Sequence, residues 1–200
     1  LLEKYLPGAV MVAEEDTEHL RSPAGSADLE KVTRHLAFFF PQAVPADIWR
    51  WIECGQGKPA SSFWTLDPID GTRAFIAGEE TFAHSLAVAE GGRVTAGVIY
   101  LPALDRLYTA CAHGPAMRDG VEIAASTRRD CTGASLLTTG PSLAAEHWPG
   151  GVPQVARSFR ASIAYRLCLV AEGRFDGMLS QRRTWEWDIA AGALIAARAG

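Results

Sequence analysis

Apolar and polar residues along the chain predict a series of short β-strands. Residues 63–66 are two aromatics, a threonine and a leucine, a composition typical of a strand. Three further apolar runs follow, separated by Gly91-Gly92 and Pro102-Ala103, and turn-forming pairs of this kind favour an antiparallel meander. We expect these three strands over 82–89, 94–100 and 107–112, with shorter strands at 9–13, 121–123, 135–138 and 175–179.

Apolar residues at helical spacing predict helices between and after these strands. Four of them recur between residues 29 and 39, and Pro41 ends that helix. A short helical turn is expected over 72–76, a longer helix over 159–172, and another from Asp188 towards the end of the chain. Strands and helices alternate without an internal repeat, which predicts an α/β (α+β) fold built from packed layers.

Composition and charge narrow the class of protein. The 200 residues carry a net charge of −4, with 48% hydrophobic and 21% charged residues, which suits one globular domain or one and a half. The acidic balance indicates neither a nucleic-acid polymer nor a membrane surface as partner, and no apolar run reaches the ~18 residues of a membrane span. Four cysteines without paired spacing favour reduced thiols in a cytoplasmic protein. We expect a larger part over 1–120, with a helical insert near 21–60, and a smaller part over 121–200 that completes the site.

The stretch from Trp64 to Thr72 places two carboxylates on a stiff segment. Asp67 comes at the predicted end of a strand, Pro68 fixes the backbone that follows, and Asp70 is three residues further on. Like charges held this close repel each other unless a cation lies between them, and Mg²⁺ prefers carboxylate oxygens. The competing interpretation is a hairpin turn at Asp70-Gly71 with Asp67 as a solvated acid.

Acids also flank ordered elements at two distant places. The strand predicted at 9–13 runs directly into Glu14, which makes this glutamate a candidate site residue rather than part of a solvated acidic turn. Near the other end, Trp185-Glu186-Trp187-Asp188 is followed by Ile189 and then by the small residues 190–192, which allow a helix to begin close to a neighbouring backbone. Asp188 alone could instead be the N-cap of that helix.

In this order, the stretches Trp64–Thr72 and Trp185–Gly192 resemble the two signatures of the inositol monophosphatase superfamily. These are Mg²⁺-dependent, lithium-sensitive phosphomonoesterases, and they include bisphosphate nucleotidases and histidinol-phosphate phosphatases. The resemblance implies a layered α-β-α-β-α sandwich of the sugar-phosphatase type. It also implies an inositol monophosphatase-like hydrolase that activates water with two or three Mg²⁺ ions, acts on a small phosphorylated metabolite and forms a homodimer.

The same resemblance implies a role for each site residue. The catalytic group would be Thr72, Asp67 and Glu14, in which Asp67 bridges the metal ions and the Thr72 hydroxyl orients the attacking water. The substrate would be contacted by Asp70, Gly71, Thr72, Ala164, Gln181 and Asp188. The metal ligands would be Glu14, Asp67, the backbone carbonyl of Ile69, Asp70 and Asp188.

The substrate stays open at this stage. Inositol-specific members carry a glutamate where this chain has Gln181, while Arg182 and Arg183 could meet a second phosphate or form a solvated turn. Arg73 is also found in the histidinol-phosphate branch. The alternatives are therefore a 3′(2′),5′-bisphosphate nucleotidase or a histidinol-phosphate phosphatase and, behind both, a non-catalytic metal-binding relative.

Two departures from the family pattern accompany these alternatives. The insert near 21–60 could be core packing, an oligomer contact or a lid over the site. The chain begins after a further acid that family members carry and stops before their usual final strands, so we expect it to be the ordered part of a longer protein.

Overall fold

A computed structural model describes residues 10–13 and 61–200 of the chain. The helix predicted at 29–39, the insert near 21–60 and Glu14 lie outside the described residues. Within these residues, the larger sheet has seven strands in sequence order, β1 (Val10–Ala13), β2 (Ser62–Asp70), β3 (Ala83–Glu90), β4 (Arg93–Leu101), β5 (Arg106–Cys111), β6 (Met117–Arg118) and β7 (Val121–Glu122). The smaller sheet has three, in the order β10 (Gly177–Met178), β8 (Ser135–Leu137) and β9 (Ala156–Ser158).

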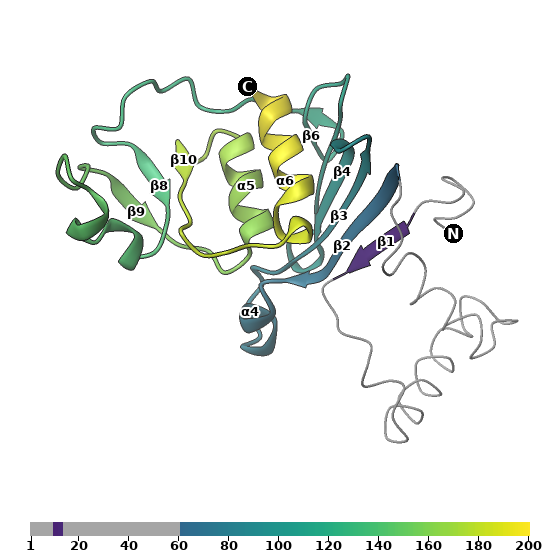
Figure 1. The fold of residues 1–200 in the computed structure, drawn as a ribbon, viewed down its shortest axis with the longest axis horizontal. Helices are drawn as coiled ribbons and strands as arrows, with labels where there is room; N and C mark the ends of the chain where they lie inside the picture. The colour runs from purple at the N-terminus through teal and green to yellow at the C-terminus, as the bar shows by residue number, and fades with distance from the viewer. Residues whose placement is uncertain (1–9, 14–60) are drawn as a thin grey trace, which may run out of the picture.

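The helices fill the space between the two sheets. These are α5 (Ile163–Ala171) and α6 (Glu186–Ala199), while the short α4 (Thr72–Ile76) projects from the end of β2 (Figure 1). Single 3-10 turns, η2 (Pro102–Leu104), η3 (Pro141–Leu143) and η4 (Ala145–His147), occur in the connections. α6 packs on β3, β4 and β5, and α5 packs between α6 and β10. The described residues therefore form a sheet, a helix pair and a second sheet, which confirms the α/β layered-sandwich class.

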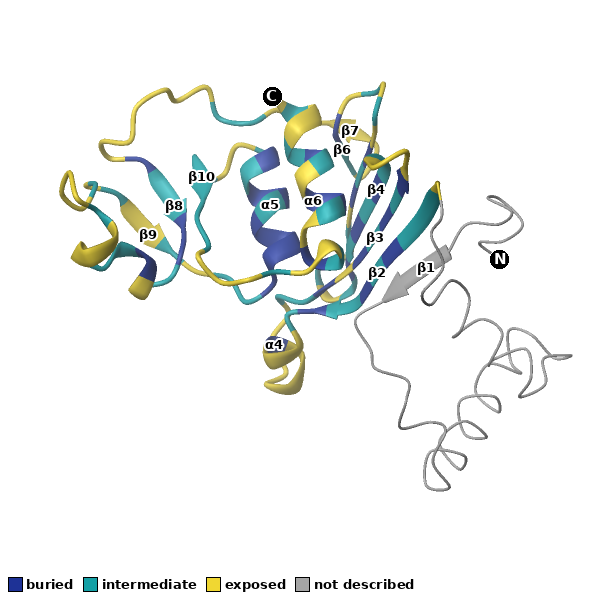
Figure 2. Ribbon diagram, in the orientation of Figure 1, coloured by how far each residue is buried: buried dark blue, intermediate teal, exposed yellow. Residues whose placement is uncertain are grey.

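Strand pairing in the larger sheet follows the hydrophobic pattern. β3, β4 and β5 form the predicted antiparallel meander, and β1 pairs with β2 in parallel, with Ala13 beside Leu66. Along β3 every second residue is buried, and these are the small residues Ala83, Ser85, Ala87 and Ala89. Helices α6 and α5 pack against β3, and Figure 2 shows its buried stretches beside them. Among the described helices none is long and apolar enough to cross a membrane.

Small residues allow α6 to lie unusually close to its neighbours. A Cβ on Gly97 of β4 would come within 2.9 Å of the Ala191 Cα, and a Cβ on Gly192 would come within 2.6 Å of the Leu167 side chain. Real Cβ atoms almost never make such contacts. The expectation that the small residues after Asp188 serve a close helix approach is therefore confirmed.

Two predicted boundaries need correction. The helix expected over 159–172 begins at Ile163, because Ser162 is extended and its Oγ accepts the Tyr165 N–H at 2.9 Å as an N-cap. Residues 140–151, for which the sequence predicts neither helix nor strand, contain the two 3-10 turns η3 and η4.

The carboxylate of Asp176, next to β10, binds the start of β8 and the segment before it. Its Oδ2 accepts hydrogen bonds from the backbone N–H of Ser135 at 2.8 Å and from the Ser135 hydroxyl at 2.9 Å. Its Oδ1 accepts a hydrogen bond from the Ser126 hydroxyl at 2.5 Å, and the Nε of Arg128 lies 3.4 Å from its Oδ2. The hydrogen bonds from Ser126 and Ser135 lower the pKa of Asp176 to about 2.

Gly97→Ala is expected to destabilise the fold by about 1–3 kcal/mol, because the new methyl group meets the α6 backbone rather than a movable side chain. Urea denaturation measures this as a lower midpoint. The matched control is Gly140→Ala, since Gly140 has φ −55° and nothing within 4 Å of an added Cβ. Equal midpoints for the two variants would show that α6 can move away without cost.

Asp176→Asn is expected to make stability less sensitive to acid. Because the folded-state pKa of about 2 lies below the ordinary 3.8, the carboxylate stabilises the fold above about pH 4, and this contribution is lost as pH falls towards 2. Urea midpoints measured from about pH 5 to about pH 2.5 should fall less steeply for the variant than for the wild type. Asp130→Asn, which removes the charge of a 70%-exposed carboxylate near Arg128, is the control and should keep the wild-type slope. Parallel slopes for all three proteins would contradict the assignment.

Candidate functional site

A β-bulge in β2 brings the first two carboxylates of the site together. Asp67 pairs with Ser85 and Asp70 with Ala83, so two residues of β2, Pro68 and Ile69, stand opposite the single residue between them on β3. Side chains alternate between faces along a regular strand, and residues three apart would point in opposite directions. The extra residue restores a common face for Asp67 and Asp70. The strand thus continues to Asp70, where the sequence predicted an end at Leu66.

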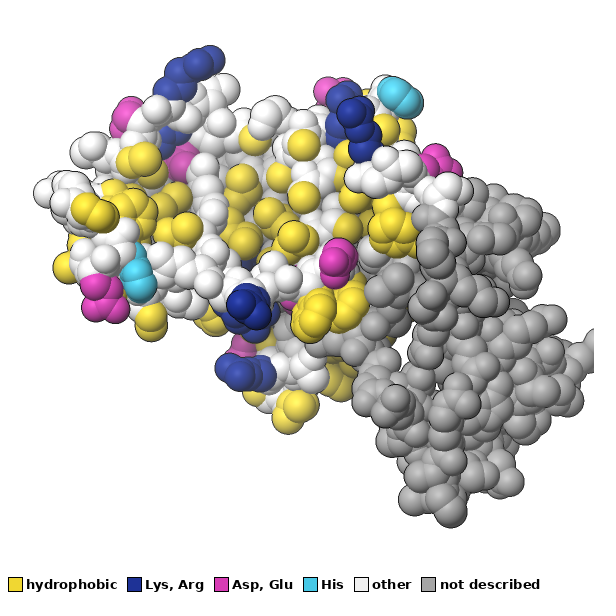
Figure 3. Space-filling view, viewed as in Figure 1, with side chains coloured by type: hydrophobic (Ala, Val, Ile, Leu, Met, Phe, Trp, Pro, Cys, Tyr) yellow, Lys and Arg dark blue, Asp and Glu magenta, His cyan; other side chains and the backbone are white. Residues whose placement is uncertain are grey.

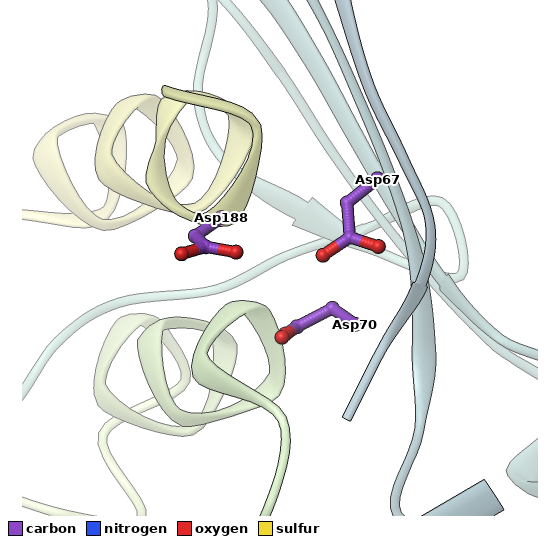
Figure 4. A group of neighbouring side chains, drawn as sticks. All are labelled: Asp67, Asp70 and Asp188. Atoms are coloured by element: carbon purple, nitrogen blue, oxygen red, sulfur yellow. The ribbon is translucent and has the colours of Figure 1, made fainter. Parts of the chain in front are cut away.

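The third carboxylate, Asp188, comes from the first turn of α6. Oxygens of Asp67, Asp70 and Asp188 all lie within 4.8 Å of one another, and Figure 4 shows the three side chains converging from β2 and α6. The residues are 1%, 4% and 7% exposed, respectively. Three buried carboxylates this close repel each other strongly unless protons or cations intervene.

Hydrogen-bond donors hold each carboxylate in place. Asp70 Oδ2 accepts the Ser162 hydroxyl at 2.5 Å and the Ala164 N–H at 2.6 Å, both at the start of α5. Asp67 Oδ1 accepts the Ile69 N–H at 3.0 Å, within the bulge. Asp188 Oδ2 accepts the Trp185 N–H at 3.0 Å, the side-chain half of a capping box at the start of α6. The competing reading of Asp188 as the N-cap is wrong, because Trp185 holds that position.

Ser85 connects the bulge to α6. It is 1% exposed and lies beside Asp67 in the β2–β3 register. Its hydroxyl donates to the backbone carbonyl of Trp187 at 3.1 Å, directly before Asp188. Ser85 therefore fixes the start of α6 relative to the strand that carries the other two carboxylates.

Burial dominates the electrostatics of the site. Desolvation raises the pKa of Asp70 to about 6, which the hydrogen bonds from Ser162 and Ala164 oppose and the charge of Asp188 reinforces. Desolvation also lowers the pKa of Arg166, a buried cation near Asp70, although the Asp70 charge opposes this shift. An anionic site that raises a carboxyl pKa by desolvation and like charge is poised to accept a cation.

The donor set fits a hard divalent cation. All three side chains present carboxylate oxygens, the ligand type of Mg²⁺, and no cysteine or histidine joins them in the described part of the chain. The Ile69 carbonyl, a further predicted ligand, accepts the Thr72 hydroxyl at 3.0 Å and keeps a second lone pair. Glu14 lies outside the described residues, although Ala13 before it pairs with Leu66 before Asp67.

These carboxylates lie in a pocket of about 770 Å³. The predicted residues Asp67, Ile69, Asp70, Gly71, Thr72, Gln181 and Asp188 all line it. Ala164 is fully buried and contributes its N–H to Asp70. The sequence interpretation missed Glu79, Thr81, Thr139, Ser142, Phe159, Arg160, Arg166 and Ser180.

Among these residues, Arg166 could have been recognised as a candidate site residue from the sequence. Arg166 is the only charged residue of α5, an otherwise apolar helix of nine residues. A cation on such a helix needs polar partners when it is buried, so its position could have marked it as part of a site.

Gly71 is the N-cap of α4 and lies beside this pocket. Its φ of 90° lies in the left-handed region, which residues with a Cβ rarely adopt. An added Cβ would also sit 3.1 Å from the Ser162 backbone nitrogen and 3.2 Å from the Thr81 carbonyl oxygen. Any larger residue here would push β2 away from the start of α5, where Asp70 is held.

Comparison with known proteins gives a consistent family. The inositol monophosphatase family profile matches residues 41–200. The chain is 35% identical over 153 residues to Nus factor SuhB from Pasteurella multocida, and 34% identical over 155 residues to an inositol-1-monophosphatase from Rhizobium meliloti. Each match covers 72% of this chain and 57% of the relative, so the chain spans little more than half the length of these relatives.

A solved structure supports the same relationship. The extragenic suppressor protein suhB from Bartonella henselae superposes with a TM-score of 0.68 at 26% identity, covering 100% of this chain and 65% of that one. The profile match, the sequence relatives and this structure agree, and the chain belongs to the inositol monophosphatase family.

Proposed function

We propose that this protein is a Mg²⁺-dependent phosphomonoester hydrolase of the inositol monophosphatase type. The observation that carries the proposal is the group of three buried carboxylates from β2 and α6, within 4.8 Å of one another in a pocket that also contains arginines and hydroxyls. A relative named inositol-1-monophosphatase, 34% identical to this chain, supports the reaction class. The substrate is then a small phosphorylated metabolite.

Asp67, Asp70 and Asp188 would hold the metal ions, with Glu14 and the Ile69 carbonyl as the further ligands expected from the family pattern. Divalent ions at such a site lower the pKa of a bound water and neutralise charge on the phosphoryl oxygens. The hydrogen bonds from Ser162, Ala164 and Trp185 serve to aim the carboxylates, so that their geometry is set before any ion arrives.

Thr72 is suited to orient the attacking water. Its hydroxyl proton is directed to the Ile69 carbonyl at 3.0 Å, so the Oγ1 lone pairs can accept a hydrogen bond from a water in the pocket. Such a bond turns a lone pair of that water towards the substrate. Water then attacks phosphorus, the ester P–O bond breaks, and the leaving alkoxide takes a proton as inorganic phosphate forms.

A panel assay tests the reaction class. Inositol 1-phosphate, adenosine 3′,5′-bisphosphate and histidinol phosphate are incubated with Mg²⁺, with and without lithium, and phosphate release is measured. Turnover that requires Mg²⁺ and falls with lithium supports the proposal. Mg²⁺ binding without turnover of any compound favours the alternative, a metal-binding relative without this activity. The name Nus factor SuhB, carried by several relatives, states no hydrolase activity, so this assay decides between the two.

Asp67→Asn is expected to lower turnover by about a hundredfold or more while the fold persists, because a neutral amide ligates Mg²⁺ poorly and cannot bridge two ions. The stabilisation by Mg²⁺ in a thermal unfolding scan should also disappear. Without metal the variant should melt at or above the wild-type temperature, since one of three mutually repelling carboxylates is gone. Asp130→Asn, outside the pocket, is the control. A variant that keeps most of its turnover would refute the bridging role.

Ser85→Ala is expected to weaken Mg²⁺ binding about tenfold, the usual scale for residues that position metal ligands. The variant leaves the Trp187 carbonyl without its 3.1 Å donor and loosens α6 where it carries Asp188. Calorimetric titration with Mg²⁺ measures the change. Thr95→Val removes a comparable hydroxyl-to-carbonyl bond, to Val88 at 3.4 Å in the same sheet, and should leave Mg²⁺ affinity unchanged. If both variants bind Mg²⁺ with the same affinity, Ser85 has only a structural role.

A further inference from the structure

Arg166, the fourth residue of α5, is a buried cation beside the three carboxylates. Basic side chains gather on the surface where α4 meets the rest of the molecule (Figure 3), but Arg166 is only 5% exposed. Burial lowers the pKa of Arg166, and the charge of Asp70 opposes this shift, so the two groups interact. Because burying a cation costs free energy unless its donors are used, the partners of Arg166 indicate why it lies here.

The side chain of Arg166 folds back over the start of its own helix. Its Nε donates to the Arg160 carbonyl at 2.5 Å, and its Nη2 donates to the Ala161 carbonyl at 3.2 Å. The guanidinium also lies 4.5 Å from the centre of the Phe159 ring. A planar guanidinium presents its donors in fixed directions, so it can hold two carbonyls at a set spacing. One side chain therefore fixes the path of residues 159–161.

This segment leads directly into the donors that hold Asp70. Ser162 has an extended backbone, and its carbonyl accepts the Arg166 N–H at 3.2 Å. The Ser162 hydroxyl and the Ala164 N–H both donate to Asp70 Oδ2, at 2.5 Å and 2.6 Å. Hydrogen bonds weaken steeply when donor and acceptor are misaligned. A change in the backbone at residues 160–161 would therefore alter how Asp70 is held.

The end of β2 leaves little free space on the other side of Ser162. A Cβ on Gly71 would come within 3.1 Å of the Ser162 backbone nitrogen and within 3.2 Å of the Ser162 Cβ. Ser162 thus lies between Gly71, which follows Asp70 directly, and the segment that Arg166 holds. The position of Ser162 is set from both sides.

We propose that Arg166 is a positioning residue for the metal site: by holding the carbonyls of Arg160 and Ala161, it sets the donors that direct Asp70. The inference rests on the proposed function, in which Asp70 is a ligand of Mg²⁺. The charge of Arg166 by itself opposes the binding of a second cation nearby, because like charges repel each other. The contribution of Arg166 to Mg²⁺ binding is therefore geometric.

Two substitutions of Arg166 separate geometry from charge. Arg166→Met removes both the charge and the donors, whereas Arg166→Lys keeps the charge but lacks the planar fork. Calorimetric titration with Mg²⁺ should show binding weakened about tenfold in both variants, the scale for residues that position metal ligands. The Lys variant should bind at least as weakly as the Met variant, since it keeps the repulsion. Tighter binding in Arg166→Met with unchanged binding in Arg166→Lys would mean that only the charge acts, and would overturn the proposal.

Arg106→Met is the matched control. Arg106 donates from Nη1 to the Tyr165 hydroxyl at 3.2 Å, so it also contacts α5, but it does not line the pocket. This variant should keep the wild-type affinity for Mg²⁺. An equal loss of affinity in Arg106→Met and Arg166→Met would show that any loosening of α5 weakens the site, and would overturn the specific role of Arg166.

A double-mutant cycle tests whether Arg166 acts through Ser162. Ser162→Ala removes one donor to Asp70 and should itself weaken Mg²⁺ binding. Residues that act through one another give non-additive effects, so the double variant of Arg166→Lys and Ser162→Ala should bind Mg²⁺ more tightly than the product of the single losses predicts. Losses that multiply would contradict the proposal. Urea midpoints establish that each variant is folded, and if Arg166→Met is not, Arg166→Lys carries the comparison because it keeps the buried charge.

Kinetics separate positioning from substrate contact. With saturating Mg²⁺ and a compound that the wild type hydrolyses, Arg166→Lys should lower kcat about tenfold and leave KM within about threefold, because the reacting groups are misaligned and the substrate is still bound. A raised KM with unchanged Mg²⁺ affinity would assign Arg166 to substrate binding and overturn the positioning role.

The failure of this inference can be told from that of the proposed function. Hydrolysis with wild-type Mg²⁺ affinity in Arg166→Lys leaves the phosphatase assignment standing and overturns the inference. Mg²⁺ binding that depends on Arg166, without hydrolysis of any compound, supports the inference and contradicts the phosphatase assignment. A wild type that does not bind Mg²⁺ overturns both.

Discussion

The candidate site depends on one local irregularity, the bulge at Pro68 and Ile69 in β2. Without it, the alternation of side chains along a strand would send Asp67 and Asp70 to opposite faces of the sheet. The bulge satisfies its own polar groups. The Ile69 N–H goes to the Asp67 carboxylate, Pro68 has no N–H, and the Pro68 carbonyl meets Nδ1 of His84, the β3 residue opposite the bulge. His84 thus has a structural role at the bulge.

The layers of the fold converge on this bulge because both central helices begin there. The first turn of α5 supplies the Ser162 hydroxyl and the Ala164 N–H to Asp70, and the first turn of α6 carries Asp188 itself. Helix N-termini carry partial positive charge, so two of them directed at three carboxylates offset part of the repulsion. Ser162 serves both purposes, since its hydroxyl donates to Asp70 and accepts the Tyr165 N–H that begins the helix.

Much of this arrangement could be predicted from local sequence, and the remainder could not for physical reasons. The meander of β3, β4 and β5 follows from period-two patterns and turn pairs, and the small residues after Asp188 correctly indicated close packing of α6. The bulge depends on pairing between β2 and β3, which the sequence of β2 alone does not contain. Apolar residues at helical spacing predict a start of α5 at residue 159, whereas the extended backbone and N-cap bond of Ser162 delay it to Ile163. The sequence points to Arg182 but not to Arg160 or Arg166, because only the tertiary fold places these residues of separate segments at one pocket.

The carboxylates and the arginines of the pocket differ in how firmly the fold holds them. Each carboxylate accepts at least one hydrogen bond that fixes its direction, as a cation site with strict geometry requires. Among the arginines, Arg166 is buried and held by two backbone carbonyls, while Arg182 is exposed on the segment that leads to α6. Under the proposed function, the firmly held carboxylates suit the reacting phosphate, because its alignment with the attacking water sets the rate. The more adaptable arginine side then suits a part of the substrate that needs only to be held.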